Sequence, residues 1–246
     1  MISIKSFVLA ILCLSISITG LSGCASKGKE QVKEEPPIAP IKKIAILPIQ
    51  NPLKFTLDKS GSALILLGIF GQSIHHADIA GKNDGFSHKM REHTLPIGGE
   101  IMASLEQGLI AQNYEVIVLR DQNMGFAAPK DFDYRKVTTD ADAIIHVIIN
   151  EAGVASPLRS TNYKPQLNVD VYIISAKDQR KIDDWGVDYG ADASKLDNGN
   201  IPADAKFAWG TYEILMKKMP DVVDGLQQGA KLLGPHIAKT MRERNL

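Results

Sequence analysis

The sequence predicts an α/β (α+β) fold: a single domain with a mixed sheet of about five strands, flanked by helices and including a C-terminal β-hairpin. Short β-branched runs alternate with amphipathic helical stretches between residues 43 and 244. Two of these runs, 166–176 and 182–189, alternate apolar with polar residues on either side of a polar turn. The composition, 44% hydrophobic and 23% charged, is typical of a globular chain, and 246 residues fit one domain with an insertion.

The charge balance and the positions of the cysteines limit which partners and which stabilising bonds are expected. Lys plus Arg and Asp plus Glu each total 28, so there is no net basic field, and no nucleic-acid partner is expected. The cysteines are Cys13, in an apolar N-terminal run, and Cys24. If that run is removed and Cys24 is lipidated, no thiol remains for a disulfide, and stability must come from core burial.

Residues 1–23 have the features of a signal peptide. Lys5 supplies a positive start, residues 7–18 are mostly apolar, and small residues lead into Cys24. The apolar run suits a signal peptide and is short for a membrane-spanning helix, which needs about 20 residues. The alternatives are an ordinary secretory signal and an anchor that stays uncleaved.

The residues Leu21-Ser22-Gly23-Cys24 resemble the bacterial lipobox. The resemblance implies cleavage between Gly23 and Cys24, a diacylglycerol on the Cys24 thiol and acylation of the new amine. Two or more acyl chains hold a protein firmly on a membrane. Ala25 follows, whereas an Asp there favours inner-membrane retention in enteric-type bacteria. We therefore expect a lipid anchor on the periplasmic face of the outer membrane.

Residues 24–41 comprise the lipidated cysteine and a predicted disordered tether. The segment is rich in Lys, Glu and Pro and lacks a periodic apolar face. When fully extended it reaches at most about 55 Å, so a domain at 42–246 could hang clear of the membrane. The alternative is a leader that packs along the domain.

The domain begins with a predicted buried strand at 43–50, and an unusual insertion follows at 60–93. Residues 63–70 are uncharged and largely apolar, and the apolar positions continue at helical spacing to residue 77. Three interpretations stay open: a buried core helix, a helix that lies on a membrane or binds a partner, and a mobile insertion. The candidate contact residues are Leu64, Leu66, Leu67, Ile69 and Phe70.

Four of the six histidines lie in this insertion: His75, His76, His88 and His93. No metal site is predicted, because adjacent histidines cannot share one helix face and the spacing matches no zinc pattern. A loop at 81–87 is expected to separate the first pair from His88. No cofactor is expected.

The middle of the chain predicts a helix at 94–113, with Thr94 as its N-cap, and strands at 114–119 and 142–150. His146, in the later strand, is interpreted as a core or cross-strand residue. The buried stripe of the helix is expected to comprise Ile97, Ile101, Leu105, Leu109 and Ala111.

The C-terminal part predicts the hairpin and two helices. One face of the strand at 166–176 is polar, which indicates an antiparallel neighbour. Helices are expected at 206–219 and 221–244. The second helix has a long apolar stripe of Val222, Leu226, Ala230, Leu233, Ile237 and Met241.

No catalytic motif emerges from the sequence. It has no glycine-rich phosphate loop and no Gly-x-Ser-x-Gly elbow. Asp183 and Asp184 are adjacent on a predicted strand, so their side chains point to opposite faces and cannot directly form an acid–base pair. No catalytic residue is assigned, and the protein is predicted not to be an enzyme.

Four segments, 44–51, 108–118, 141–147 and 169–182, lie in the order strand, helix, strand, strand, hairpin, helix behind the predicted lipidated cysteine. In these segments the chain resembles the periplasmic domain shared by the CsgG, LpoB and GNA1162-type lipoproteins. The resemblance implies action by contact, as a channel part or an activator of other envelope machinery, without catalytic residues. Two features depart from it: the insertion replaces a short link, and the connections 153–164 and 190–204 look too short and polar for membrane-inserting hairpins.

The sequence therefore predicts a non-enzymatic accessory or assembly factor of the bacterial cell envelope, anchored through Cys24, that contacts an unidentified protein or its own copies. One alternative is a component of an oligomeric outer-membrane secretion channel. A second alternative is a periplasmic hydrolase or a metal-binding protein, which would need a pocket with convergent polar groups.

Overall fold

A computed structural model describes residues 40–59, 68–120, 129–156, 162–190 and 200–246, but not the side chains of 59 and 68–79. The predictions for the signal peptide, Cys24, almost all of the tether, Leu64, Leu66 and Leu67 lie outside these residues. All described helices and strands belong to one compact unit, Ile38–Leu246.

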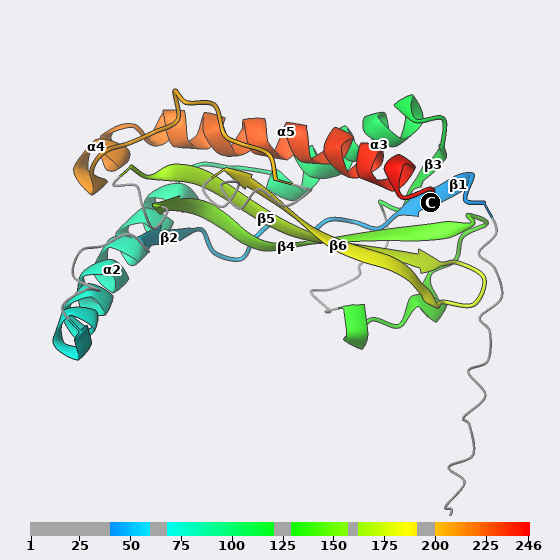
Figure 1. Ribbon diagram of the computed structural model, residues 1–246, viewed down its shortest axis with the longest axis horizontal. Coiled ribbons are helices and arrows are strands. Elements are labelled where there is room, and N and C mark those ends of the chain that lie inside the picture. The colour runs from blue at the N-terminus through cyan, green and yellow to red at the C-terminus, as the bar shows by residue number, and fades with distance from the viewer. Residues whose placement is uncertain (1–39, 60–67, 121–128, 157–161, 191–199) are drawn as a thin grey trace, which may run out of the picture. The chain divides into compact units, whose positions relative to one another are not determined.

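A mixed sheet of six strands and four helices make up the described part of the chain, which confirms the predicted class (Figure 1). The strands are β1 (Lys43–Ile46), β2 (Thr56–Lys59), β3 (Glu115–Val118), β4 (Ala143–Ser156), β5 (Lys164–Ser175) and β6 (Lys181–Gly190). The helices are α2 (Gly68–Arg91), α3 (Ile97–Ala111), α4 (Tyr212–Lys217) and α5 (Met219–Glu243). Two short 3₁₀ turns, Pro129–Asp131 and Tyr134–Lys136, precede β4.

The strands lie in the order β3-β1-β4-β5-β6, and β2 pairs with the second half of β4. β1 is parallel to β3 and to β4, whereas β4, β5 and β6 are successively antiparallel. The β5–β6 pair confirms the predicted hairpin. Along the middle of β5 the apolar residues are buried and the polar ones are half-buried, as the alternating sequence predicts.

The main core lies between the sheet and the helices α3 and α5, which run along the same side of it (Figure 1). Each residue of the predicted α5 stripe is fully buried, and so are the first four of the α3 stripe, whereas Ala111 is exposed. The two helices cross closely through small residues. Ser104 Oγ donates to the Ala230 carbonyl at 3.0 Å, and a Cβ on Gly108 would lie 2.9 Å from the Cα of Pro235.

The predicted loop at 81–87 is wrong, because α2 continues without a break to Arg91. Tertiary contacts stabilise the helix at 81–87, where glycine, asparagine and aspartate would otherwise favour a turn. Phe86 and Met90 are fully buried, the Leu57 N–H donates to Asn83 Oδ1 at 3.3 Å, and Tyr212 Oη donates to the Lys82 carbonyl at 3.2 Å.

Other element boundaries also differ from the prediction. Strand β1 ends at Ile46, four residues earlier than expected. Helix α3 begins after Pro96 instead of at Thr94, and Asn51 accepts from the Gly98 N–H at 2.8 Å. Helix α4 begins only at Tyr212, where Thr211 Oγ1 accepts from the Ile214 N–H at 3.3 Å. Strand β4 extends to Ser156, so the supposed connection 153–164 is partly strand, and its residues pair with β2 and β5.

The opposite face of the sheet carries a smaller apolar cluster next to β1 and β4. Tyr134, after the first 3₁₀ turn, covers this face, and its Oη lies 2.9 Å from Nδ1 of His146. His146 is 9% exposed, as expected for a core residue, and burial lowers its pKa to about 4. None of the helices in the described ranges is long and apolar enough to cross a membrane.

Candidate functional site

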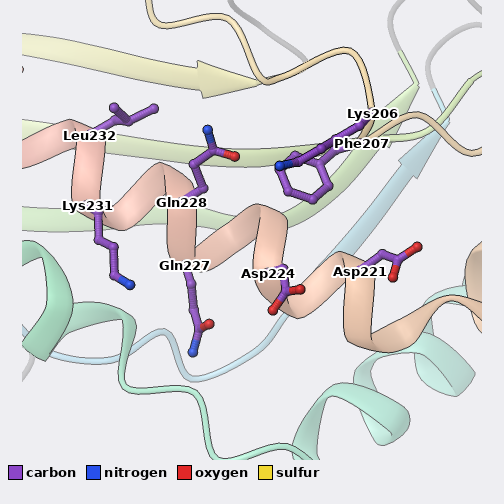
Figure 2. A pocket seen from close by; sticks show the side chains of 8 residues that line it. All are labelled: Lys206, Phe207, Asp221, Asp224, Gln227, Gln228, Lys231 and Leu232. Atoms are coloured by element: carbon purple, nitrogen blue, oxygen red, sulfur yellow. The ribbon is translucent and has the colours of Figure 1, made fainter.

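An open groove with a volume of about 630 Å³ lies on the solvent side of α5 (Figure 2). Helix α5 forms most of it, and the segment before α4 forms one wall. The lining residues are Lys206, Phe207, Asp221, Asp224, Gln227, Gln228, Lys231 and Leu232.

Backbone pairing and aromatic packing fix the wall of the groove. Tyr163 and Trp209 exchange backbone hydrogen bonds of 2.8 and 2.9 Å, which tie the segment to the start of β5. Phe207 is 5% exposed, and its ring lies so close to Gly225 that a Cβ there would be 3.2 Å from Cγ. Glycine at this position therefore lets the wall pack directly on α5. Lys206 Nζ lies over the same ring, 4.8 Å from its centroid.

The floor of the groove is the polar side of a helix whose other side is buried in the core. Asp221 and Asp224 lie near the start of α5, where a helix favours negative charge. Lys231 follows two turns later and is exposed. Leu232 is 39% exposed, an apolar side chain among polar ones. In Figure 2, Gln228 and Leu232 lie on the same side of α5 as Phe207.

The lining offers groups of several kinds that can contact a ligand. It supplies carboxylates, amides, ammonium groups and one exposed leucine. The ammonium of Lys206 is 3.5 Å from Asp204, and that of Lys218 is 3.6 Å from Asp221. Such exposed pairs are weak and can exchange with charges on a ligand.

The contact residues predicted from the sequence cannot be compared with the groove. Ile69 and Phe70 belong to the backbone of α2, but their side chains are not described, and Leu64, Leu66, Leu67 and Cys24 lie outside the described residues. His88 lies 3.8 Å from Glu92 on the exposed face of α2. No three His, Cys, Asp or Glu side chains gather as a metal site in the ranges that the structure covers.

The adjacent carboxylates have separate partners, as predicted for opposite strand faces. Asp183 accepts from Arg244 Nη1 at 2.9 Å, and Asp184 pairs with Lys181. The sequence did not predict the groove, because 206–219 was expected to be one helix, whereas the helix begins only at Tyr212. The sequence feature that could have predicted the groove is the Lys206-Phe207 pair, which packs beside the polar side of α5.

Comparison with known proteins gives only distant structural likeness. No family model matches the chain, and no curated protein matches it. Among solved structures it is similar to lipoprotein GNA1162 from Neisseria meningitidis, with 8% identity, a TM-score of 0.32, and coverage of 60% of this chain and 81% of that one.

Two further structures have similar values. A DUF330 protein from Xanthomonas campestris has 5% identity, a TM-score of 0.42 and coverage of 85% of this chain and 93% of that one. The PelC dodecamer from Paraburkholderia phytofirmans has 11% identity, a TM-score of 0.31 and coverage of 81% and 91%. Similarities at this level carry no functional assignment, and the resemblance to CsgG and LpoB stays a prediction.

Proposed function

We propose that this protein is a lipid-anchored accessory of the bacterial cell envelope, which binds a partner protein through the groove on α5 and performs no chemistry of its own. The observation that carries the proposal is the groove. It combines a fixed helix surface, charges of both signs and an exposed leucine beside a buried aromatic wall. Protein-binding surfaces commonly have an apolar centre within a polar rim.

The anchor and the groove have complementary roles in this proposal. Lipid on Cys24 would hold the protein on the periplasmic face of the outer membrane, and the tether would let the domain reach a partner about 55 Å away at most. The groove would then provide specificity, because α5 is held by its buried stripe and needs little reordering on binding.

The test places a photo-crosslinking amino acid at Gln228 in the full-length protein and captures the partner in intact cells. Binding of the identified partner to the purified lipoprotein is then measured with Leu232→Asp and Lys231→Glu. We expect each change to weaken binding about tenfold or more, because groove contacts are lost or reversed in charge. The matched control is Lys177→Glu, an exposed residue in the β5–β6 turn, which should leave the affinity unchanged.

Leu66→Asp and Phe70→Asp test the insertion as the competing contact surface. If these changes abolish binding and the groove variants leave it intact, the groove proposal is wrong. Hydrolysis of peptidoglycan or peptide substrates by the purified lipoprotein would overturn the non-enzymatic part.

A further inference from the structure

The β6 edge of the sheet is protected against pairing with another strand. Ile201 exchanges backbone hydrogen bonds of 2.8 and 2.9 Å with Asp188 and Gly190, which covers one end of the edge. The rest of the strand carries the charged side chains of Lys181, Asp183 and Asp184. Charges and covering segments are common devices that keep an edge strand from adding a foreign strand.

The β3 edge carries one charged side chain, Glu115 at its start, and no covering segment in the part of the chain that the structure describes. There β3 pairs with β1 alone, at the end of the sheet order (Figure 1). From Val116 to Leu119 the side chains are aliphatic and half-buried. Ile110, just before β3 at the end of α3, is 56% exposed. After Glu115, this edge is therefore aliphatic and uncovered among the described residues.

The hydrogen bonds to β1 fix which backbone groups of β3 point outward. The N–H groups of Glu115 and Leu119 donate to carbonyls of the β1 segment at 2.8 and 3.0 Å. Backbone groups alternate in direction along a strand, so Val116 and Val118 direct their N–H and C=O groups away from β1. The Val118 carbonyl accepts from the Arg120 N–H at 3.1 Å and retains a second lone pair.

We propose that β3 pairs in antiparallel orientation with β3 of a second copy of this chain, centred on Ile117. In this register Val116 faces Val118 of the other copy, and both outward N–H groups of each strand find carbonyl acceptors. An aliphatic strand such as this one also packs well against its own copy.

Charge complementarity favours this partner and this orientation. Glu115 begins the strand and Arg120 follows its end, with side chains 67% and 61% exposed. Within one chain they pair with Lys43 at 2.9 Å and with Glu106 at 3.2 Å, and a facing charge can replace such exposed, weak pairs. Antiparallel pairing brings the acidic start of each strand beside the basic end of the other, whereas parallel pairing would place like charges together. Anchoring on one membrane raises the local concentration of copies. This surface is separate from the α5 groove, so the inference goes beyond the proposed function.

The test uses Ile117→Cys in the full-length lipoprotein, oxidised in intact cells and followed as a disulfide-linked dimer. Residues facing each other at the centre of an antiparallel pair are close enough for a disulfide. Val116→Cys is the matched control, because two copies of that residue lie about 8 Å apart in this register, too far to be joined. Asp184→Cys reports on the β6 edge. We expect strong crosslinking at position 117 and little at the other two.

A second variant breaks the pairing without breaking the sheet. Val118→Pro removes an outward N–H and leaves the bonds to β1 intact, and proline is tolerated on edge strands. Added to Ile117→Cys, it should reduce the dimer association constant by about 30-fold, because two hydrogen bonds are lost from the symmetric pair.

The outcomes separate this inference from the proposed function. Equal crosslinking at 116 and 117, or none at 117 in membrane-bound protein, overturns the β3 pairing. A disulfide-linked dimer of the unmodified chain would instead show that Cys24 is not lipidated, which contradicts the anchor. Loss of partner binding in the groove variants leaves the crosslinking result unaffected.

Discussion

The two edges of the sheet, β6 and β3, differ in the contacts that cover them among the described residues. The β6 edge is fastened to α5 at several points: Tyr189 Oη donates to the Gly225 carbonyl at 3.0 Å, and Arg244 stacks 4.8 Å from the Trp185 ring. The β3 edge carries half-buried aliphatic side chains and outward backbone groups. The difference indicates that substitutions at β6 should change the stability of one copy, whereas substitutions at β3 should change association between copies.

The largest effect is expected for Tyr189→Ala. The side chain is fully buried, its ring contacts Gly229, and its hydroxyl is bonded to α5. Removing it should lower the free energy of unfolding by about 3–5 kcal/mol, measured by urea denaturation. The control Tyr189→Phe loses only the hydroxyl bond and should cost about 1 kcal/mol. Equal stability of the wild type and Tyr189→Ala would show that the β6–α5 contact is not a stabilising one.

A smaller, pH-dependent effect is expected between the two edges, at His146 in the central strand β4. Burial lowers the pKa of His146 from 6.5 to about 4, so the unfolded chain binds a proton that the folded chain excludes between these values. The contribution of neutral His146 to the free energy of unfolding is therefore fully present above pH 6.5. It falls by up to about 3 kcal/mol as the pH drops to about 4. Urea midpoints at pH 7 and pH 4.5 measure the loss.

His146→Phe is the control for this pH dependence. It removes the titrating group and also the 2.9 Å contact with Tyr134, so it costs some stability at every pH. The fall between pH 6.5 and 4 should be smaller than in the wild type. An identical fall in both proteins would assign the pH dependence to other groups.

The smallest effect is expected for Arg244→Gln at the β6 edge. The guanidinium is 2.9 Å from Asp183, but the two side chains are 39% and 28% exposed, so solvent screens the pair. The variant should lose less than about 1 kcal/mol in the same urea assay. Asp183→Asn should lose a similar amount. A loss comparable to that of Tyr189→Ala would mean that the fastening of this edge is mainly electrostatic.

The periodicity of apolar residues in the sequence predicted the hairpin and helix α5. Alternation in 166–176 and 182–189 predicted the hairpin, and the stripe from Val222 to Met241 predicted α5, because these patterns bury one face wherever the neighbours lie. Strand β2 was not predicted, because it is only four residues long and two of them, Asp58 and Lys59, are charged. It is stabilised by pairing with β4.

The sequence by itself determined the class of fold, the hairpin and the α5 stripe, and it predicts the lipid anchor at Cys24. The tertiary structure decided where helices begin and continue. Asn51, from a distant loop, accepts a hydrogen bond from the first turn of α3. Asn83 accepts one from the Leu57 N–H and so stabilises α2 where its sequence is rich in glycine.

The α5 groove and the open β3 edge also belong to the tertiary structure. The groove forms because Phe207 packs on Gly225. The edge arises because β3 pairs with β1 alone among the described strands. Both depend on contacts between residues far apart in the chain, which local propensity and periodicity do not encode.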